Sequence, residues 1–145
     1  MKFWDASAMI SLCLEEPWTS DLRAIAAEDQ ALVVWWGTPI ECTSAFARLR
    51  REGGLRDTDE DQAYLLLERL ATVWTEIRPT HEVREQAKRA LRLHPLRAAD
   101  ALQLAAALVW TQGQSSGHAF VCLDRRLRQA ARREGFLLSP VTERL

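Results

Sequence analysis

The stretch LRAADALQLAAALVW, from Leu96 to Trp110, is apolar on nearly every side from Ala98 onward. Its polar exceptions after that point are one acid, Asp100, and one amide, Gln103. The pattern predicts a helix, and a helix that is apolar all round lies inside a protein. An acid near a helix N-terminus gains roughly 0.3–1 kcal/mol from the helix dipole, which gives Asp100 a structural explanation. That explanation leaves open whether other acids lie beside it.

Short apolar stretches alternate with helical patterns along the rest of the chain. β-Branched and aromatic residues, as in ALVVWW, are typical of buried strands. Apolar residues four positions apart, as in ASAMISLCLEE, are typical of helices. Strands separated by helices predict an α/β fold with a parallel sheet covered on both faces, in a single domain over residues 1–145. The predicted strands are 2–5, 31–36, 74–77, 118–124 and 136–141, and the predicted helices are 6–16, 17–29, 38–54, 57–74, 80–93, 98–110 and 125–135.

Composition excludes several classes of protein. The chain has 145 residues, of which 48% are hydrophobic, so a disordered chain is excluded. The formal net charge is −1, so no global basic field indicates a nucleic-acid partner. Cys13, Cys42 and Cys122 are far apart and have no C-x-x-C spacing, which argues against a zinc site. Without a signal peptide or an apolar run of membrane-spanning length, the sequence predicts a cytoplasmic protein with no membrane partner.

Four acids fall at the starts of four predicted helices. Asp5 ends the first strand, and Asp124 ends the strand AFVCLD. Glu41 lies in the first turn of the helix after ALVVWW, and Asp100 opens the buried helix. In open parallel sheets, binding sites lie beyond the carboxyl ends of the strands. The sequence therefore predicts that these four carboxylates converge on one pocket.

Each acid also has a structural interpretation. Asp5 and Asp124 fit as ordinary N-caps, each worth about 1 kcal/mol. Thr38 fits as the N-cap of the helix at 38–54, with Pro39 in the first turn, and TPIE then forms a capping box that uses Glu41. For any one acid alone the structural interpretation is favoured. The occurrence of all four at the same end of their elements favours a shared site.

Converging carboxylates require raised pKa values or a cation. Two unit charges about 5 Å apart repel by ~3 kcal/mol at an effective dielectric of 20. Several such pairs rival the ~5–15 kcal/mol that holds a domain together. Hard divalent ions prefer oxygen ligands, so Mg²⁺ or Mn²⁺ is favoured over zinc. A carboxylate-held ion of this kind activates water and stabilises a leaving phosphate oxygen, which predicts hydrolysis of a phosphodiester.

At these residues the sequence resembles the PIN-domain ribonucleases, and most closely their VapC-type toxin branch. FWDASAMISL is similar to the family's opening strand, and TPIECTSAFARL is similar to its second block. LRAADALQLAAAL is the most specific match, and AFVCLDRRLRQAARREGF is similar to the last block. These blocks occur in order over essentially the whole chain. The resemblance implies metal-ligand roles for Asp5, Glu41, Asp100 and Asp124, and a supporting role for Ser7.

The resemblance also implies the architecture and partners of the protein. The family has a three-layer α/β/α sandwich with a short, mainly parallel central sheet. Its members are endoribonucleases that depend on Mg²⁺ or Mn²⁺, usually homodimers, each with a cognate antitoxin whose tail occupies the active-site groove. Two positions depart from the family pattern. Ala6 stands where many relatives carry Thr or Ser, and Cys122 stands where Thr or Ser is frequent.

Arginine supplies 17 of the 19 basic residues, because Lys2 and Lys88 are the only lysines. Arginine suits bidentate phosphate contacts, but an arginine-rich genome composition gives the same bias and is favoured. Arg97, just before Asp100, fits phosphate binding and pairing with an acid equally well. A solvated helix face is favoured for most of the arginines after the last acid, and an RNA-phosphate patch is the functional alternative. These arginines are Arg125, Arg126, Arg128, Arg132 and Arg133.

Apolar residues outside the acid blocks have two interpretations. Trp35 and Trp36 point to opposite faces if both lie in a strand, so both are expected in the core or at a dimer interface, in preference to stacking on RNA bases. The apolar helix AMISLCLEE fits the core and a dimer or antitoxin surface equally well.

Other functions are left open by the residues themselves. Phosphoryl transfer through an aspartyl phosphate also uses an acid at a strand end, but DASA lacks a second acid two residues on, and lysines are scarce. A non-enzymatic, partner-binding α/β domain would use the acids only as caps, and a PIN-type nuclease outside the toxin branch is a further alternative. Divalent ions should stabilise a metal-dependent nuclease by mass action and leave a cap-only protein unchanged.

Overall fold

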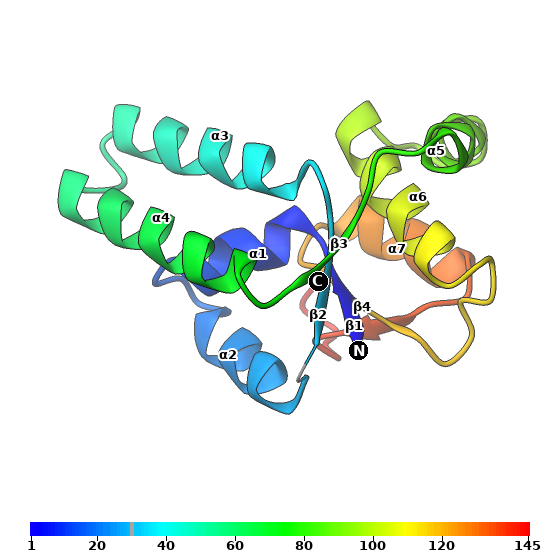
Figure 1. Ribbon diagram of the computed structural model, residues 1–145. Coiled ribbons are helices and arrows are strands. Elements are labelled where there is room, and N and C mark those ends of the chain that lie inside the picture. Colours follow the sequence, from blue (N-terminus) through cyan, green and yellow to red (C-terminus); the bar gives the residue numbers. More distant parts are fainter. Residues whose placement is uncertain (30) are drawn as a thin grey trace.

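The computed structural model describes residues 1–29 and 31–145 with their side chains. Over these residues, five strands form one sheet in the order β3-β2-β1-β4-β5, and every neighbouring pair is parallel (Figure 1). Each strand has three or four residues, so the sheet is short, as predicted. The strands are β1 (Lys2–Trp4), β2 (Leu32–Trp35), β3 (Thr75–Ile77), β4 (Ala119–Val121) and β5 (Leu137–Ser139).

Helices cover both faces of the sheet. In Figure 1, α1 to α4 lie on one side of the strands and α5 to α7 on the other. The buried side chains divide in the same way, into one cluster on each side of the sheet. The predicted three-layer α/β/α sandwich is therefore confirmed. The helices are α1 (Ala6–Cys13), α2 (Thr19–Glu28), α3 (Thr38–Arg51), α4 (Asp57–Ala71), α5 (His81–Leu93), α6 (Ala98–Trp110) and α7 (Arg125–Arg133).

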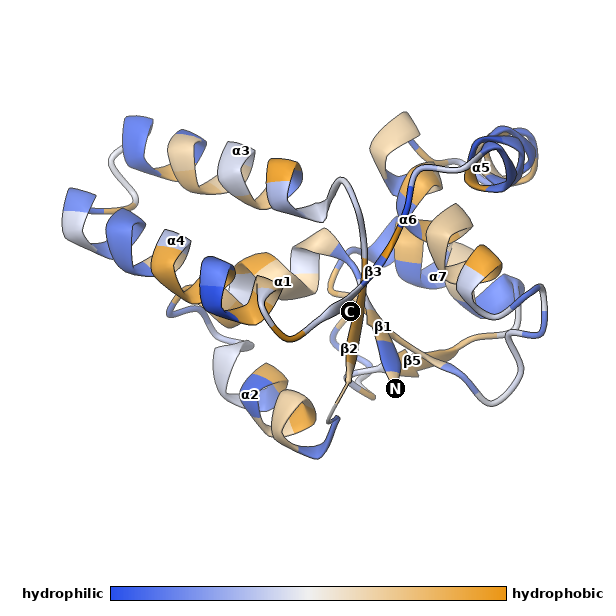
Figure 2. Ribbon diagram, in the orientation of Figure 1, coloured by the Kyte–Doolittle hydropathy of each residue, from blue (hydrophilic) through white to orange (hydrophobic). Residues whose placement is uncertain are grey.

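Burial on both faces explains the apolar strands and the apolar helix α6. Successive side chains of a strand point to opposite faces, so Val33 packs on the α5–α7 side and Val34 on the α1–α4 side. Seven residues of α6 are buried, because this helix packs against the sheet, α5 and α7. Figure 2 shows hydrophobic residues along β2 and hydrophilic ones around α5. Within the described ranges, no helix is both long and apolar enough to cross a membrane.

Two local features at the end of β2 differ from what the sequence predicts. Trp35 is buried at 6% exposure, but Trp36 is 43% exposed and lies outside the core, because the strand ends at Trp35. A dimer interface at Trp36 stays a prediction. Helix α3 begins at Thr38, with Gly37 as its N-cap and no side-chain cap. The predicted cap at Thr38 and the capping box with Glu41 do not form, because both side chains accept hydrogen bonds from another helix.

Candidate active site at the carboxyl edge of the sheet

Asp5 and Asp124 lie at the carboxyl ends of neighbouring parallel strands. β1 pairs with β4, and Asp5 and Asp124 follow these strands as the N-caps of α1 and α7. The Asp5 carboxylate accepts a hydrogen bond from the Ala8 amide at 3.0 Å, and that of Asp124 accepts from the Leu127 amide at 2.8 Å. Both acids therefore do cap helices, and the strand order also brings them to one edge of the sheet.

Asp5 is buried and held by several hydrogen-bond donors. It is 3% exposed, and the Ser7 hydroxyl donates to its Oδ1 at 2.7 Å. The Ser7 oxygen accepts from the Leu123 amide at 2.9 Å, which ties the start of α1 to the end of β4. The Cys122 thiol donates to Asp5 Oδ2 at 3.2 Å. Burial raises the Asp5 pKa from 3.8 to about 6, although the bonds from Ala8, Ser7 and Cys122 oppose the shift.

Glu41 is held by an amide from the facing helix. Gln103 of α6 donates from Nε2 to Glu41 Oε1 at 3.1 Å and to Thr38 Oγ1 at 3.0 Å. The Glu41 pKa is raised from 4.5 to about 7, chiefly by burial and to a smaller extent by the charges of Asp5 and Asp100, whereas the Gln103 bond opposes the shift. Asp5 and Asp100 are therefore near enough for their charges to act on Glu41.

Asp100 completes the group from the first turn of α6. Burial raises its pKa, and the charge of Asp124 raises it further. Arg97, the N-cap residue of α6, and Arg126 of α7 lower it. The four predicted acids are therefore linked by mutual repulsion, from Asp5 to Glu41, from Glu41 to Asp100, and from Asp100 to Asp124.

The donors at this edge have the chemistry of a divalent-cation site. All four are carboxylates, which hard cations such as Mg²⁺ and Mn²⁺ prefer. In the part of the chain that the structure describes, none of the four forms an ion pair, although the charges of Arg97 and Arg126 act on Asp100. Among residues 1–29 and 31–145, however, no three His, Cys, Asp or Glu side chains lie close enough to hold one ion as they stand. The residues fit an ion that keeps several waters and takes few direct ligands, as Mg²⁺ usually does.

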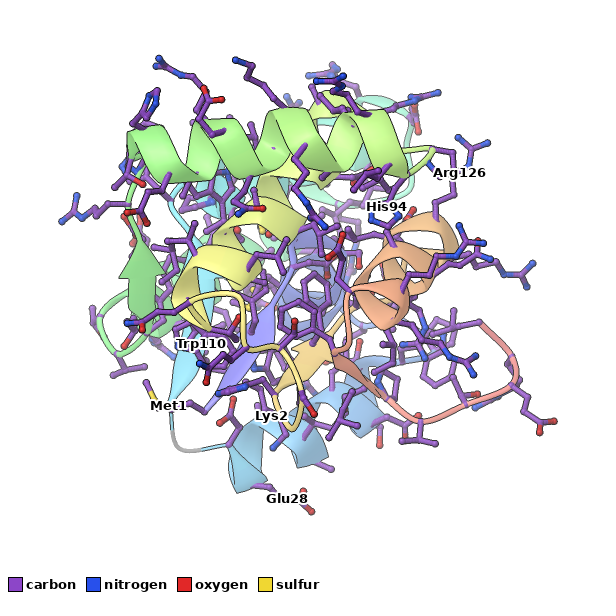
Figure 3. All side chains as sticks on the ribbon, turned by 90° about the vertical axis from the view of Figure 1, so that its right-hand side faces the viewer. Met1, Lys2, Glu28, His94, Trp110 and Arg126 are labelled. Carbon is purple, nitrogen blue, oxygen red and sulfur yellow. The ribbon has the colours of Figure 1, made fainter. Side chains whose placement is uncertain are left out.

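The arginines after Asp124 separate into different environments. Arg125 and Arg126 are exposed beside the site, and Figure 3 shows Arg126 on the outside of the molecule. Arg128 belongs neither to a solvated helix face nor to an RNA patch, because it is 8% exposed. Its guanidinium donates to the backbone oxygens of Cys122 at 2.7 Å and Pro140 at 2.9 Å.

Two residues in contact with the predicted acids were not assigned from the sequence. Gln103 contacts Glu41. The feature of the sequence that could have indicated this role is that Gln103 is the single amide in an apolar helix. Cys122 contacts Asp5. The feature that could have indicated this role is that Cys122 occupies a position where the family that the sequence resembles often has a hydroxyl. Burial raises the pKa of Cys122 well above its usual range, so the thiol stays protonated and can donate to Asp5.

Comparisons with known proteins support the fold. The structure is similar to a solved structure titled "Crystal Structure of FitAcB from Neisseria gonorrhoeae", with a TM-score of 0.60 and 15% sequence identity. The match covers 95% of this chain and 96% of the other. The predicted PIN-like fold is confirmed. No protein-family model and no curated protein sequence matches the chain.

Proposed function

We propose that this protein is a divalent-metal-dependent endoribonuclease and the toxin of a toxin–antitoxin pair. The observation that carries the proposal is the placement of Asp5 and Asp124 after neighbouring parallel strands of a PIN-like sheet, with Glu41 and Asp100 in the first turns of two helices that Gln103 joins. The sequence blocks that supply these acids are those that resemble the PIN-domain ribonucleases. Asp5, Glu41, Asp100 and Asp124 are the proposed catalytic and metal-holding residues, and Mg²⁺ or Mn²⁺ is the proposed cofactor.

The side chains have separate roles in this proposal. Ser7 and Cys122 hold the Asp5 carboxylate by donating to it, and Gln103 holds that of Glu41. Exposed Arg97, Arg125 and Arg126 bind phosphates of the RNA in this proposal. A bound divalent ion would make water a stronger nucleophile and offset charge on the scissile phosphate.

The partners follow from the same proposal. RNA is the substrate, and a cognate antitoxin controls the enzyme by covering the acid group. A homodimer in the cytoplasm is the proposed form. The antitoxin and dimer are inferred from the sequence resemblance, and the similarity to the FitAcB structure supports the shared fold on which that inference rests.

The positions of the lysines weigh against phosphoryl transfer through an aspartyl phosphate. Lys2 begins β1, at the opposite end of the strand from Asp5, and the Lys88 ammonium on α5 pairs with Glu85 at 3.2 Å. Two alternatives remain: a PIN-type nuclease outside the toxin branch, and a non-enzymatic, partner-binding domain whose acids only cap helices. Asp5 and Asp124 are caps, but Glu41 is not, because its carboxylate accepts from Gln103 of another helix.

Replacing Asp100 with asparagine should lower metal-dependent RNA cleavage by more than about 100-fold, since losing only an outer-shell partner of a metal costs 10–100-fold. The assay uses purified, partner-free protein and total RNA with Mn²⁺, and with EDTA in a parallel reaction. The matched control is Asp57→Asn, an exposed acid at the start of α4, far from the sheet (Figure 1). Cleavage that survives EDTA, or that Asp100→Asn leaves unchanged, would contradict the proposal.

A further inference from the structure

Gln103 is a buried polar side chain in an apolar helix. It is 1% exposed, and its neighbours in α6, Leu104 and Ala105, are fully buried. Burying an amide without compensating hydrogen bonds costs free energy, so such a residue needs partners. An apolar residue of similar size would fill this place in the core without that requirement. The amide therefore calls for an explanation other than packing.

The hydrogen bonds of Gln103 are one-sided. Nε2 donates both to Thr38 Oγ1 and to Glu41 Oε1, which lie in the first turn of α3. Oε1 is buried and has no hydrogen-bond partner among the described residues. A buried amide that only joined two helices would be expected to use both of its ends. Here the donor end bonds both Thr38 and Glu41, and the acceptor end is left unpaired among the described residues.

The spacing along α6 relates this amide to a second acid. Asp100 and Gln103 are three residues apart, so they project from the same side of the helix. α6 therefore carries one acid directly and fixes another, Glu41, through the amide. The separation of the two carboxylates is set by one rigid helix instead of by two independently placed helices.

We propose that Gln103 is a positioning residue that fixes the Glu41 carboxylate relative to Asp100 for divalent-cation binding. This inference rests on the proposed function, because it assumes that the acid group takes a cation. Donation from Nε2 favours the ionised carboxylate and orients it, which prepares Glu41 to act as a ligand. Gln103 itself contacts neither the cation nor the RNA.

Replacing Gln103 with methionine tests the proposal, because methionine keeps the length of the side chain and removes the donor. Calorimetry at pH 8 should show a Mn²⁺ dissociation constant raised about 10-fold, the lower end of the effect of losing an outer-shell partner. Gln62→Met, at an exposed position on α4, is the matched control and should change it less than twofold. A dissociation constant equal to that of the unmodified protein would overturn the inference.

A double-mutant cycle separates positioning from general damage to the fold. In a Glu41→Met background, Gln103→Met should cause no further weakening of Mn²⁺ binding, because the amide then has no carboxylate to orient. A further loss of about 10-fold in that background would mean that Gln103 acts by another route, and would overturn the proposal. Circular dichroism of each variant checks that the secondary structure is retained.

The same cycle in EDTA distinguishes this inference from the proposed function. The change in melting temperature caused by Gln103→Met should differ between the unmodified protein and the Glu41→Met background, because only the unmodified protein contains the amide–carboxylate bond. Equal changes would overturn the positioning role. A clear difference in EDTA, together with no effect of Mn²⁺ on the unmodified protein, would support the Gln103–Glu41 link and refute the metal-dependent function.

Discussion

Replacing Asp5 with asparagine should stabilise the metal-free protein while removing the proposed nuclease activity. Asparagine has the same shape and keeps an acceptor for the Ala8 amide and the Ser7 hydroxyl, but it carries no charge. The Asp5 carboxyl is buried, and burial raises its pKa from 3.8 to about 6. The ionised carboxylate is therefore disfavoured in the folded protein relative to the unfolded chain, and the variant removes that penalty.

The size of this stabilisation depends on pH. Because the folded-state pKa is raised, the protonated Asp5 stabilises the fold fully below about pH 4, and that contribution is lost as pH rises through about 6. A shift of this size corresponds to about 3 kcal/mol in the free energy of unfolding. Asp5→Asn should match the unmodified protein near pH 4 and exceed it by up to about 3 kcal/mol above pH 7.

Urea unfolding in EDTA at several pH values between 4 and 8 measures this difference. Adding Mn²⁺ at pH 8 should stabilise the unmodified protein and leave Asp5→Asn unchanged, because binding to the folded state raises its stability by mass action. RNA cleavage by the variant should fall by more than about 100-fold, beyond the cost of losing an outer-shell partner. A stability difference that stays constant from pH 4 to pH 8 would show that Asp5 is not held as the structure describes.

The same pattern is expected for Glu41, whose pKa is raised to about 7. Its stabilising contribution is present below about pH 4.5 and is lost as pH rises through about 7. Asp5 and Glu41 together therefore lower the free energy of unfolding of the metal-free protein at neutral pH relative to mildly acidic pH. If the protein binds a divalent cation as proposed, the cation would remove this weakness, and folding stability would then depend on metal binding.

The fold could be predicted because its signals are local. The hydrophobic pattern indicates the alternation of short apolar strands and helices. Parallel pairing follows because helices separate the consecutive strands. The errors occurred where an element ends. Trp36 lies one residue past β2, and Thr38 lies one residue inside α3, and in both cases a shift of one residue changes the environment of the side chain.

The site was predictable only as far as strand ends determine it. Asp5 and Asp124 follow adjacent parallel strands, so topology alone brings them together. The contacts of Gln103 and Cys122 depend on how α6 and β4 are rotated toward the acids, and rotation is set by packing across the whole domain. Arg128 is a similar case. Its charge predicted an exposed side chain, whereas its hydrogen bonds to backbone oxygens hold it in the interior.

Replacing Arg128 with methionine should be among the most destabilising single changes in this protein. The guanidinium donates to the backbone oxygens of Cys122, Ser139 and Pro140, at 2.7, 3.3 and 2.9 Å. These oxygens lie at or just beyond the carboxyl ends of β4 and β5. The Ser139 oxygen also accepts from the Cys122 amide at 3.0 Å, so the oxygens of Cys122 and Pro140 depend most on the guanidinium. Methionine fills a similar space but donates nothing, so buried acceptors lose their partner, at a cost of about 1–3 kcal/mol each.

Thermal unfolding should show a fall in melting temperature of roughly 10 °C, for a loss of about 3 kcal/mol in a chain of this size. Arg133→Met, an exposed arginine on the same helix, is the matched control and should change the melting temperature by only about 1 °C. Arg128→Lys should lie between the two, because a single ammonium cannot reproduce the planar fork that reaches three carbonyls. Equal melting temperatures for Arg128→Met and Arg133→Met would place Arg128 on the solvated face of α7. A large difference would show that one arginine of the basic helix holds together the ends of β4 and β5, the first of which precedes Asp124.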